Sequence, residues 1–179
     1  LPFCNLFLDA QIVEQDVECN VFSRDSIISE IDGSASISYI PGQNDLVLSY
    51  TLDYDVPYMK TQTYTFTLSP EEFIQEIAPA RNFCLESEVE ELKRRGLGKG
   101  ADYNNTLVLG EKGVINNHTR FPDEFVRHKI LDLIGDLFLI GGPIRGTVVA
   151  VRSGHELNAK FLHKLFCDKR VKPKHEDEE

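Results

Sequence analysis

Three segments in the first half of the chain alternate between apolar and polar side chains, and this alternation constrains the fold most. They are rich in β-branched and aromatic residues and lie at residues 36–40, 46–52 and 62–68. A period of two residues places the apolar side chains on one face of a strand. Because Pro41-Gly42 and Val56-Pro57 separate the segments, the pattern predicts an antiparallel meander with one buried face.

The second half of the chain carries helix signals. Ser69 followed by Pro70 predicts a helix start, and Ser153 with Glu156 forms a capping-box pattern at another. Helices are expected at residues 1–10, 69–78, 86–95, 122–138 and 153–166, with further strands at 11–14, 83–85, 105–109 and 147–151. Strands followed by two long helices predict an α+β fold, a two-layer sandwich of a mainly antiparallel sheet packed on those helices.

Composition excludes several classes of function. The chain has 179 residues and a formal net charge of −10, so a nucleic-acid partner is not expected. It contains no apolar run of about 18 residues, so no transmembrane helix is expected either. Four scattered cysteines without a CxxC pair favour a reducing, cytoplasmic location over a disulfide framework. The charged residues 168–179 are expected to form a disordered tail.

A stripe of polar residues lies on the longest predicted helix. His128, Asp132 and Asp136 are spaced four residues apart, which places them one above another on a helix otherwise rich in Ile and Leu. A His and an Asp at this spacing can bind one metal ion as two of the three protein ligands of a catalytic zinc. A partly exposed His–Asp pair without metal is the alternative interpretation.

His155 is the second candidate for chemistry. It lies in the first turn of the last predicted helix, where the helix dipole disfavours the imidazolium. A carboxylate such as Asp136 would oppose that effect, and a histidine balanced in this way suits a general acid near neutral pH. A histidine that only decorates a helix start is the alternative. Arg81, Asn82 and the neighbouring Phe83 could line a groove for an amphipathic ligand.

These segments together closely resemble the UDP-3-O-acyl-N-acetylglucosamine deacetylases of lipid A biosynthesis, the LpxC family. The resemblance is carried by the runs Arg127-His128-Lys129-Ile130-Leu131-Asp132-Leu133-Ile134-Gly135-Asp136-Leu137, Ser153-Gly154-His155-Glu156-Leu157-Asn158 and Ala78-Pro79-Ala80-Arg81-Asn82-Phe83, with Gly100 to Asn105. The start Ala10-Gln11-Ile12-Val13-Glu14 also fits, although the family usually has Gly at the position of Gln11.

The resemblance implies roles for individual residues. His128 and Asp132 match two of the three metal ligands, for zinc or alternatively iron(II). Lys129 matches a lysine that stabilises charge on the substrate, and His155 matches a second catalytic histidine that Asp136 orients. Further implied features are substrate contacts at Arg81, Asn82 and Phe83, and a small βαβ insert at about residues 83–109 that forms the acyl-chain passage. The substrate would be a UDP-linked acylated glucosamine.

Two departures from the family pattern matter. Asn82 stands where the family usually has a Thr that faces the reacting carbonyl. The family's third zinc-binding His and its general-base Glu belong to an N-terminal domain. Residues 1–32 are expected to be only the end of that domain and a linker, and residues 33–167 the C-terminal catalytic domain. The chain alone is therefore expected to be catalytically incomplete and to need the missing domain as its partner.

Two other classes of function stay open. A non-catalytic derivative of the fold could bind a nucleotide-sugar lipid or a protein, but such a module needs no stripe of His and Asp residues. An unrelated metal hydrolase would not explain the resemblance outside the metal segment.

Overall fold

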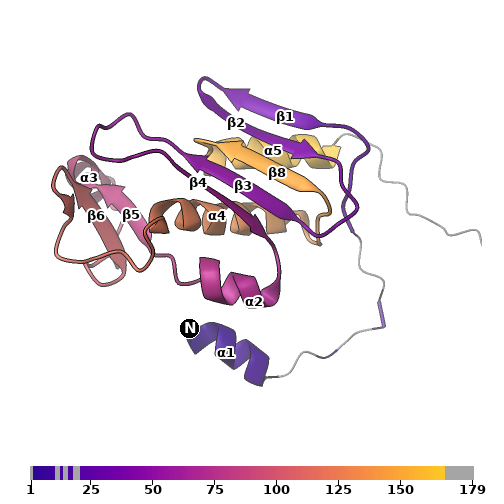
Figure 1. The fold of residues 1–179 in the computed structure, drawn as a ribbon, viewed down its shortest axis with the longest axis horizontal. Helices are drawn as coiled ribbons and strands as arrows, with labels where there is room; N and C mark the ends of the chain where they lie inside the picture. The colour runs from indigo at the N-terminus through magenta and orange to yellow at the C-terminus, as the bar shows by residue number, and fades with distance from the viewer. Residues whose placement is uncertain (1, 11–12, 14–15, 18–20, 168–179) are drawn as a thin grey trace, which may run out of the picture.

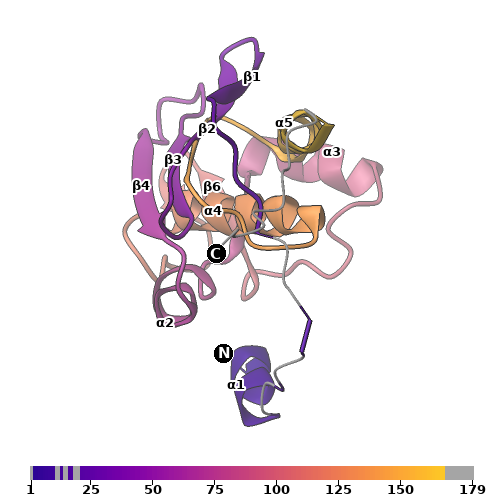
Figure 2. The ribbon, with the colours of Figure 1, turned by 90° about the vertical axis from the view of Figure 1, so that its right-hand side faces the viewer.

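The computed structural model describes residues 2–10, 13, 16–17 and 21–167. Within them, a five-stranded sheet carries two long helices on one of its faces (Figure 1; Figure 2). The elements of this body are β1 (Ile28–Asp32), β2 (Ala35–Ile40), β3 (Val47–Leu52), β4 (Gln62–Thr67), β8 (Thr147–Val151), α4 (Glu124–Leu137) and α5 (His155–Cys167). The predicted α+β two-layer sandwich is confirmed.

The strand order differs from a simple meander. The sheet runs β1-β2-β8-β3-β4, so the last strand of the chain lies between β2 and β3. Strand β8 is antiparallel to β2 and parallel to β3, and all other pairs in this sheet are antiparallel. The prediction that β2 and β3 are neighbours is therefore wrong. Alternation specifies which face of a strand is buried but not its neighbours, and β1 was not predicted.

The core lies between the sheet and its two helices. On β3, Leu48, Tyr50 and Leu52 point inward and are nearly inaccessible. Ile130 and Leu133, three residues apart on α4, are fully buried against them. Apolar residues repeated every 3.6 positions on α4 thus pack on apolar residues repeated every two positions on β3. Polar residues can then occupy the side of α4 that faces away from the sheet.

A second, three-stranded sheet forms at one end of the sandwich. Its elements are β5 (Asn82–Leu85), η2 (Glu86–Glu88), α3 (Val89–Arg94), β6 (Thr106–Gly110) and β7 (Gly113–Val114). Strands β5 and β6 are parallel and joined through α3, as Figure 1 shows, and β7 extends the sheet antiparallel to β6. The small βαβ unit is confirmed, and β7 adds a strand that was not predicted.

The helix predicted after Ser69 is present, although its geometry changes along its length. It starts as α2 (Pro70–Glu72) and continues as the π-helical turn η1 (Phe73–Ile77). The hydroxyl of Ser69 accepts the backbone N–H of Glu72 at 3.2 Å, which is the predicted cap.

The capping box predicted at the start of α5 is wrong. The buried hydroxyl of Ser153 has no hydrogen-bond partner among the described residues. Helix α5 begins at His155 instead, and the N–H of Asn158 bonds the carbonyl of Gly154. The carbonyl of Ser153 accepts the hydroxyl of Tyr50, which ties this turn to the sheet.

Two short elements complete the described chain. Helix α1 (Pro2–Asp9) falls where a helix was predicted and lies apart from the sandwich in both views (Figure 1; Figure 2). The 3₁₀ turn η3 (Phe138–Ile140) follows α4. The predicted tail 168–179 and most of the predicted strand 11–14 lie outside the described residues. No helix within the described part of the chain is both long and apolar enough to cross a membrane.

Two glycines predict opposite effects of the same substitution. Gly146, just before β8, has φ +117°, and a Cβ there would lie 2.7 Å from the carbonyl oxygen of Ile40. We expect Gly146→Ala to lower the free energy of unfolding by about 1–3 kcal/mol. Gly135→Ala is the control, since it has open space inside α4 and is expected to stabilise by up to about 1 kcal/mol. Urea unfolding measures both, and equal losses would contradict the account.

Candidate functional site

Helix α4 presents the predicted polar stripe at three successive turns. The side chains of His128, Asp132 and Asp136 are 13%, 20% and 18% exposed, so each is reachable from solvent but largely surrounded by protein. Their neighbours one or two positions away, such as Leu133 and Ile130, face the core. The helix therefore fixes the stripe rigidly, because its apolar side is packed against the sheet.

The geometry of His128 and Asp132 fits a shared metal ion. Nε2 of His128 lies 3.4 Å from Oδ1 of Asp132. A tetrahedral Zn²⁺ bound at about 2.0–2.1 Å holds two ligand atoms about 3.3–3.4 Å apart. An imidazole nitrogen and a carboxylate oxygen are also donors that zinc and iron(II) accept. The described residues contain no group of three or more His, Cys, Asp or Glu placed to hold an ion. The candidate site therefore has two potential ligands in this part of the chain.

The surroundings of His128 favour the form that binds metal. Burial lowers the pKa of this imidazole below its ordinary value, an effect that outweighs the opposing influence of Asp132 and of the Ala80 carbonyl. Nδ1 lies 3.4 Å from that carbonyl oxygen. A proton held there leaves Nε2 free to coordinate, an arrangement common around metal-bound histidines.

Lys129 places a positive charge beside the same carboxylate. Its Nζ donates to Oδ2 of Asp132 at 2.9 Å, and its side chain is only 15% exposed. The other oxygen of Asp132, Oδ1, faces His128. The Asp132 carboxylate thus contacts both His128 and Lys129. The ammonium group of Lys129 is held next to the candidate metal position.

His155 reaches the stripe from α5. Its Nδ1 lies 3.0 and 2.9 Å from the two carboxylate oxygens of Asp136. Because an ionised carboxylate only accepts, Nδ1 carries the proton and Nε2 is directed away from Asp136. The side chain is 70% exposed. The structure therefore brings His155 and Asp136 together as predicted, and it makes Asp136 the residue that orients the imidazole.

Phe83 connects the small sheet to the stripe. Its ring stands edge-on to those of Phe125, Tyr54 and His128, with centroids 5.0, 5.9 and 6.2 Å away. These aromatic contacts fix β5 against α4. Burial raises the pKa of Tyr54, so its phenol stays protonated. An apolar wall formed by Phe83 thus adjoins the candidate metal ligand His128.

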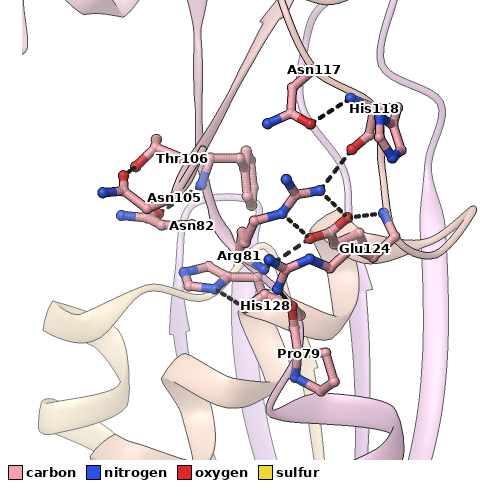
Figure 3. A network of polar contacts seen from close by, with 12 residues as sticks. Pro79, Arg81, Asn82, Asn105, Thr106, Asn117, His118, Glu124 and His128 are labelled. Atoms are coloured by element: carbon pink, nitrogen blue, oxygen red, sulfur yellow. Dashed lines mark hydrogen bonds and ion pairs between the residues drawn. The ribbon is translucent and has the colours of Figure 1, made fainter. Parts of the chain in front are cut away.

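Asn82 and Arg81, the other two residues predicted to bind substrate, differ in availability. Asn82 is exposed, and its Oδ1 accepts the N–H of Phe83 at 2.8 Å. Its amide NH₂ has no partner among the residues that the structure describes. Arg81 is instead bound by Glu124 through Nε at 2.9 Å and Nη2 at 3.1 Å (Figure 3). Its guanidinium also donates to the carbonyl of His118 at 2.7 Å.

Sequence reasoning did not single out two residues that organise this region. Glu124 is fully buried at the start of α4 and is the acceptor of the Arg81 network. Asn158 is 2% exposed on α5 and donates from Nδ2 to Oδ2 of Asp136 at 2.8 Å. Asn158 lies inside a recognisable motif, but neither residue carries a pattern that reveals its buried partner.

Glu124 predicts a specific loss of stability in acid. Burial alone would raise the pKa of its carboxyl, but hydrogen bonds from Arg81 and Arg120 outweigh this and lower the pKa. The stabilisation is therefore complete above the ordinary Glu pKa and declines as pH falls through the lower folded value. Urea unfolding at about pH 7 and about pH 3 should show this loss. In the double variant Arg81→Met/Glu124→Leu, the part of the acid loss that Glu124 contributes should be absent. An equal loss of stability in acid in the double variant and the unsubstituted chain would contradict the prediction.

Comparison with known proteins shows which family the chain belongs to. Residues 1–167 match the family described as LpxC, UDP-3-O-acyl N-acetylglycosamine deacetylase. Relatives named UDP-3-O-acyl-N-acetylglucosamine deacetylase include those of Myxococcus xanthus, 36% identical over 93% of the chain, and Wolinella succinogenes, 38% identical over 93%. The relative of the same name from Actinobacillus succinogenes is 38% identical over 95% of the chain.

The fold and these matches define the class first: the chain is part of a family of enzymes named as deacetylases. More particularly, the chain belongs to the LpxC family. It covers 53% of the Myxococcus relative and 56% of each of the other two, so it spans about half the length of the curated relatives it matches.

Proposed function

We propose that this chain is the C-terminal part of a zinc-dependent hydrolase that removes the N-acetyl group from UDP-3-O-acyl-N-acetylglucosamine. This reaction belongs to lipid A biosynthesis, in the cytoplasm. The observation that carries the proposal is the 3.4 Å spacing of the His128 and Asp132 donor atoms. These two residues lie on the same helix as Asp136, which orients His155 of α5. The names of the relatives supply the substrate class.

His128 and Asp132 would hold the metal, with iron(II) as the alternative to zinc. A third ligand and the general base would come from the part that the longer relatives contain in addition. Bound there, the ion supplies Lewis acidity, which polarises the acetamide carbonyl and lowers the pKa of a water. The chain alone would then be inactive, because two protein ligands leave the site incomplete.

The remaining residues of the stripe would act on charge and protons. The Lys129 ammonium stabilises negative charge as it develops on the carbonyl oxygen after water adds to the carbonyl carbon. When the C–N bond breaks, Nε2 of His155 protonates the leaving amine, and acetate is the other product. Asp136 keeps a proton on Nδ1, so that Nε2 is the nitrogen that donates to the leaving amine. Amine and acetate together account for the added water.

Substrate contacts would come from the segment that leads into the small sheet. The Asn82 amide group can donate to the substrate, and Phe83 offers an apolar surface beside His128. Arg81 stays a predicted contact, although its guanidinium is bound by Glu124. The insert at about residues 83–109 would form the passage for the acyl chain, and the division into residues 1–32 and 33–167 stays a prediction.

Acetate release tests the proposal. The longest reading frame that contains this chain is incubated with UDP-3-O-acyl-N-acetylglucosamine, and acetate and free amine are quantified. Stoichiometric release by the intact protein, and none by the 179-residue chain, is expected. Binding of the nucleotide sugar without release by the intact, zinc-supplied protein would contradict the proposal and favour the non-catalytic alternative.

A further inference from the structure

The peptide unit between Ala80 and Arg81 is held from both sides by one helix. Its N–H, that of Arg81, donates to Oε1 of Glu124 at 3.0 Å. Its carbonyl, that of Ala80, lies 3.4 Å from Nδ1 of His128. Glu124 and His128 are one turn apart on α4, so they reach the two ends of the same peptide group. Glu124 and His128 are both labelled in Figure 3, where dashed lines mark their contacts.

Glu124 has the properties of a clamp. Its side chain is fully buried, and its two oxygens accept Nε and Nη2 of Arg81 together with the backbone N–H groups of Arg81 and Arg120. Arg120 in turn donates to the carbonyl of Pro79 at 2.7 Å. Pro79, Ala80 and Arg81 are thus each contacted by a polar group of another segment. Glu124 must keep its partners, because a buried carboxylate without them is costly.

From this we infer that Glu124 is a positioning residue for His128. By holding the Ala80–Arg81 peptide, it directs the Ala80 carbonyl at Nδ1, which keeps the proton there and leaves Nε2 bare. The nitrogen that carries the proton in a neutral imidazole is set by the hydrogen bond the other nitrogen makes. The value of this arrangement for metal binding rests on the proposed function, but the choice of tautomer does not.

The groups around His128 define how this must be tested. Asp132 faces Nε2 at 3.4 Å and competes for the proton, while Phe83 contacts the ring edge-on. Asp132→Ala removes the competing acceptor without adding a donor. In that chain Asp132 no longer offers an acceptor to Nε2, and a neutral histidine side chain in water prefers its proton on Nε2. A proton found on Nδ1 therefore reports the pull of the Ala80 carbonyl.

Imidazole ¹⁵N NMR of the metal-free Asp132→Ala chain, at about pH 8 where His is neutral, gives the decisive reading. We expect a pyrrole-type Nδ1 and a pyridine-type Nε2 for His128. Adding Glu124→Gln should turn this single tautomer into a mixture. Glu76→Gln is the matched control. Glu76 pairs at 2.5 Å with Arg127, a buried residue of α4, but does not contact the Ala80–Arg81 peptide. It should leave the tautomer unchanged.

A second variant guards against unfolding of Glu124→Gln. Arg81→Met/Glu124→Leu removes both charges and with them the clamp, so no buried charge is left unpaired, and it should also yield a mixture. A proton on Nε2 in the Asp132→Ala chain would overturn the inference, whatever the other variants do. A single Nδ1 tautomer that survives either folded clamp variant would overturn it as well.

The metal consequence is measured separately. In the longest reading frame, Glu124→Gln should weaken zinc binding by roughly 10–100-fold, the usual effect of losing a hydrogen bond behind a metal-bound histidine. Glu76→Gln should not. If the intact protein binds no zinc, the proposed function fails, and the NMR result still decides the inference about Glu124.

Discussion

Arg81→Met is expected to lower the free energy of unfolding by about 3–5 kcal/mol. The substitution leaves the Glu124 carboxylate fully buried without its charged partner, since the side chains of the pair are only 9% and 0% exposed. It also removes the guanidinium bond to the carbonyl of His118. Urea unfolding followed by circular dichroism at neutral pH measures the loss.

Two controls separate burial from charge. The double variant Arg81→Met/Glu124→Leu should recover most of the lost stability, because apolar residues often replace a buried ion pair without a net penalty. Arg94→Met breaks an exposed pair with Glu91, whose side chains are 76% and 51% exposed, and should cost less than about 1 kcal/mol. If Arg81→Met and Arg94→Met lower the free energy of unfolding equally, the buried Arg81–Glu124 pair does not fix this segment more strongly than an exposed pair would.

His155→Ala is expected to lower kcat for acetate release by roughly 10²–10⁴-fold in the longest reading frame. The imidazole is the group placed to protonate the leaving amine, and it is oriented by Asp136 at 2.9 Å. Its exposure, 70% of the side chain, leaves it free to meet a substrate. KM should change much less, because the proton is needed when the C–N bond breaks rather than when substrate binds.

His163→Ala is the matched control for this prediction. It removes a second exposed histidine from the same helix, α5, two turns beyond His155. Activity near that of the unsubstituted protein is expected. If His155→Ala and the unsubstituted protein release acetate at the same rate, the assigned role of His155 is wrong.

The sequence was most informative within single elements, where the two-residue period of a strand can be told apart from the 3.6-residue period of a helix. The two-residue period of residues 46–52 correctly predicted a strand with one buried face, on which Leu48, Tyr50 and Leu52 lie. The four-residue spacing of the stripe likewise predicted that His128 and Asp132 meet. Both successes concern a single element, within which local geometry fixes the side-chain directions.

What escaped prediction involves partners far apart in sequence. The position of β8 between β2 and β3 depends on which strand edges pair, and alternation does not encode this. Glu124 lies 43 residues from Arg81, and Asn158 lies 22 from Asp136. A glutamate in the first turn of a helix is usually explained by the helix dipole, so nothing local marks Glu124 as buried.

A zinc titration tests the central claim most directly, that this chain supplies two ligands of an incomplete metal site. The 179-residue chain should bind zinc weakly or not at all. The longest reading frame should bind one ion tightly and lose it in His128→Ala, while His163→Ala keeps it. Tight binding of one ion by the 179-residue chain that disappears in His128→Ala would contradict the two-ligand account. Tight binding by the intact protein that survives His128→Ala would remove His128 from the site altogether.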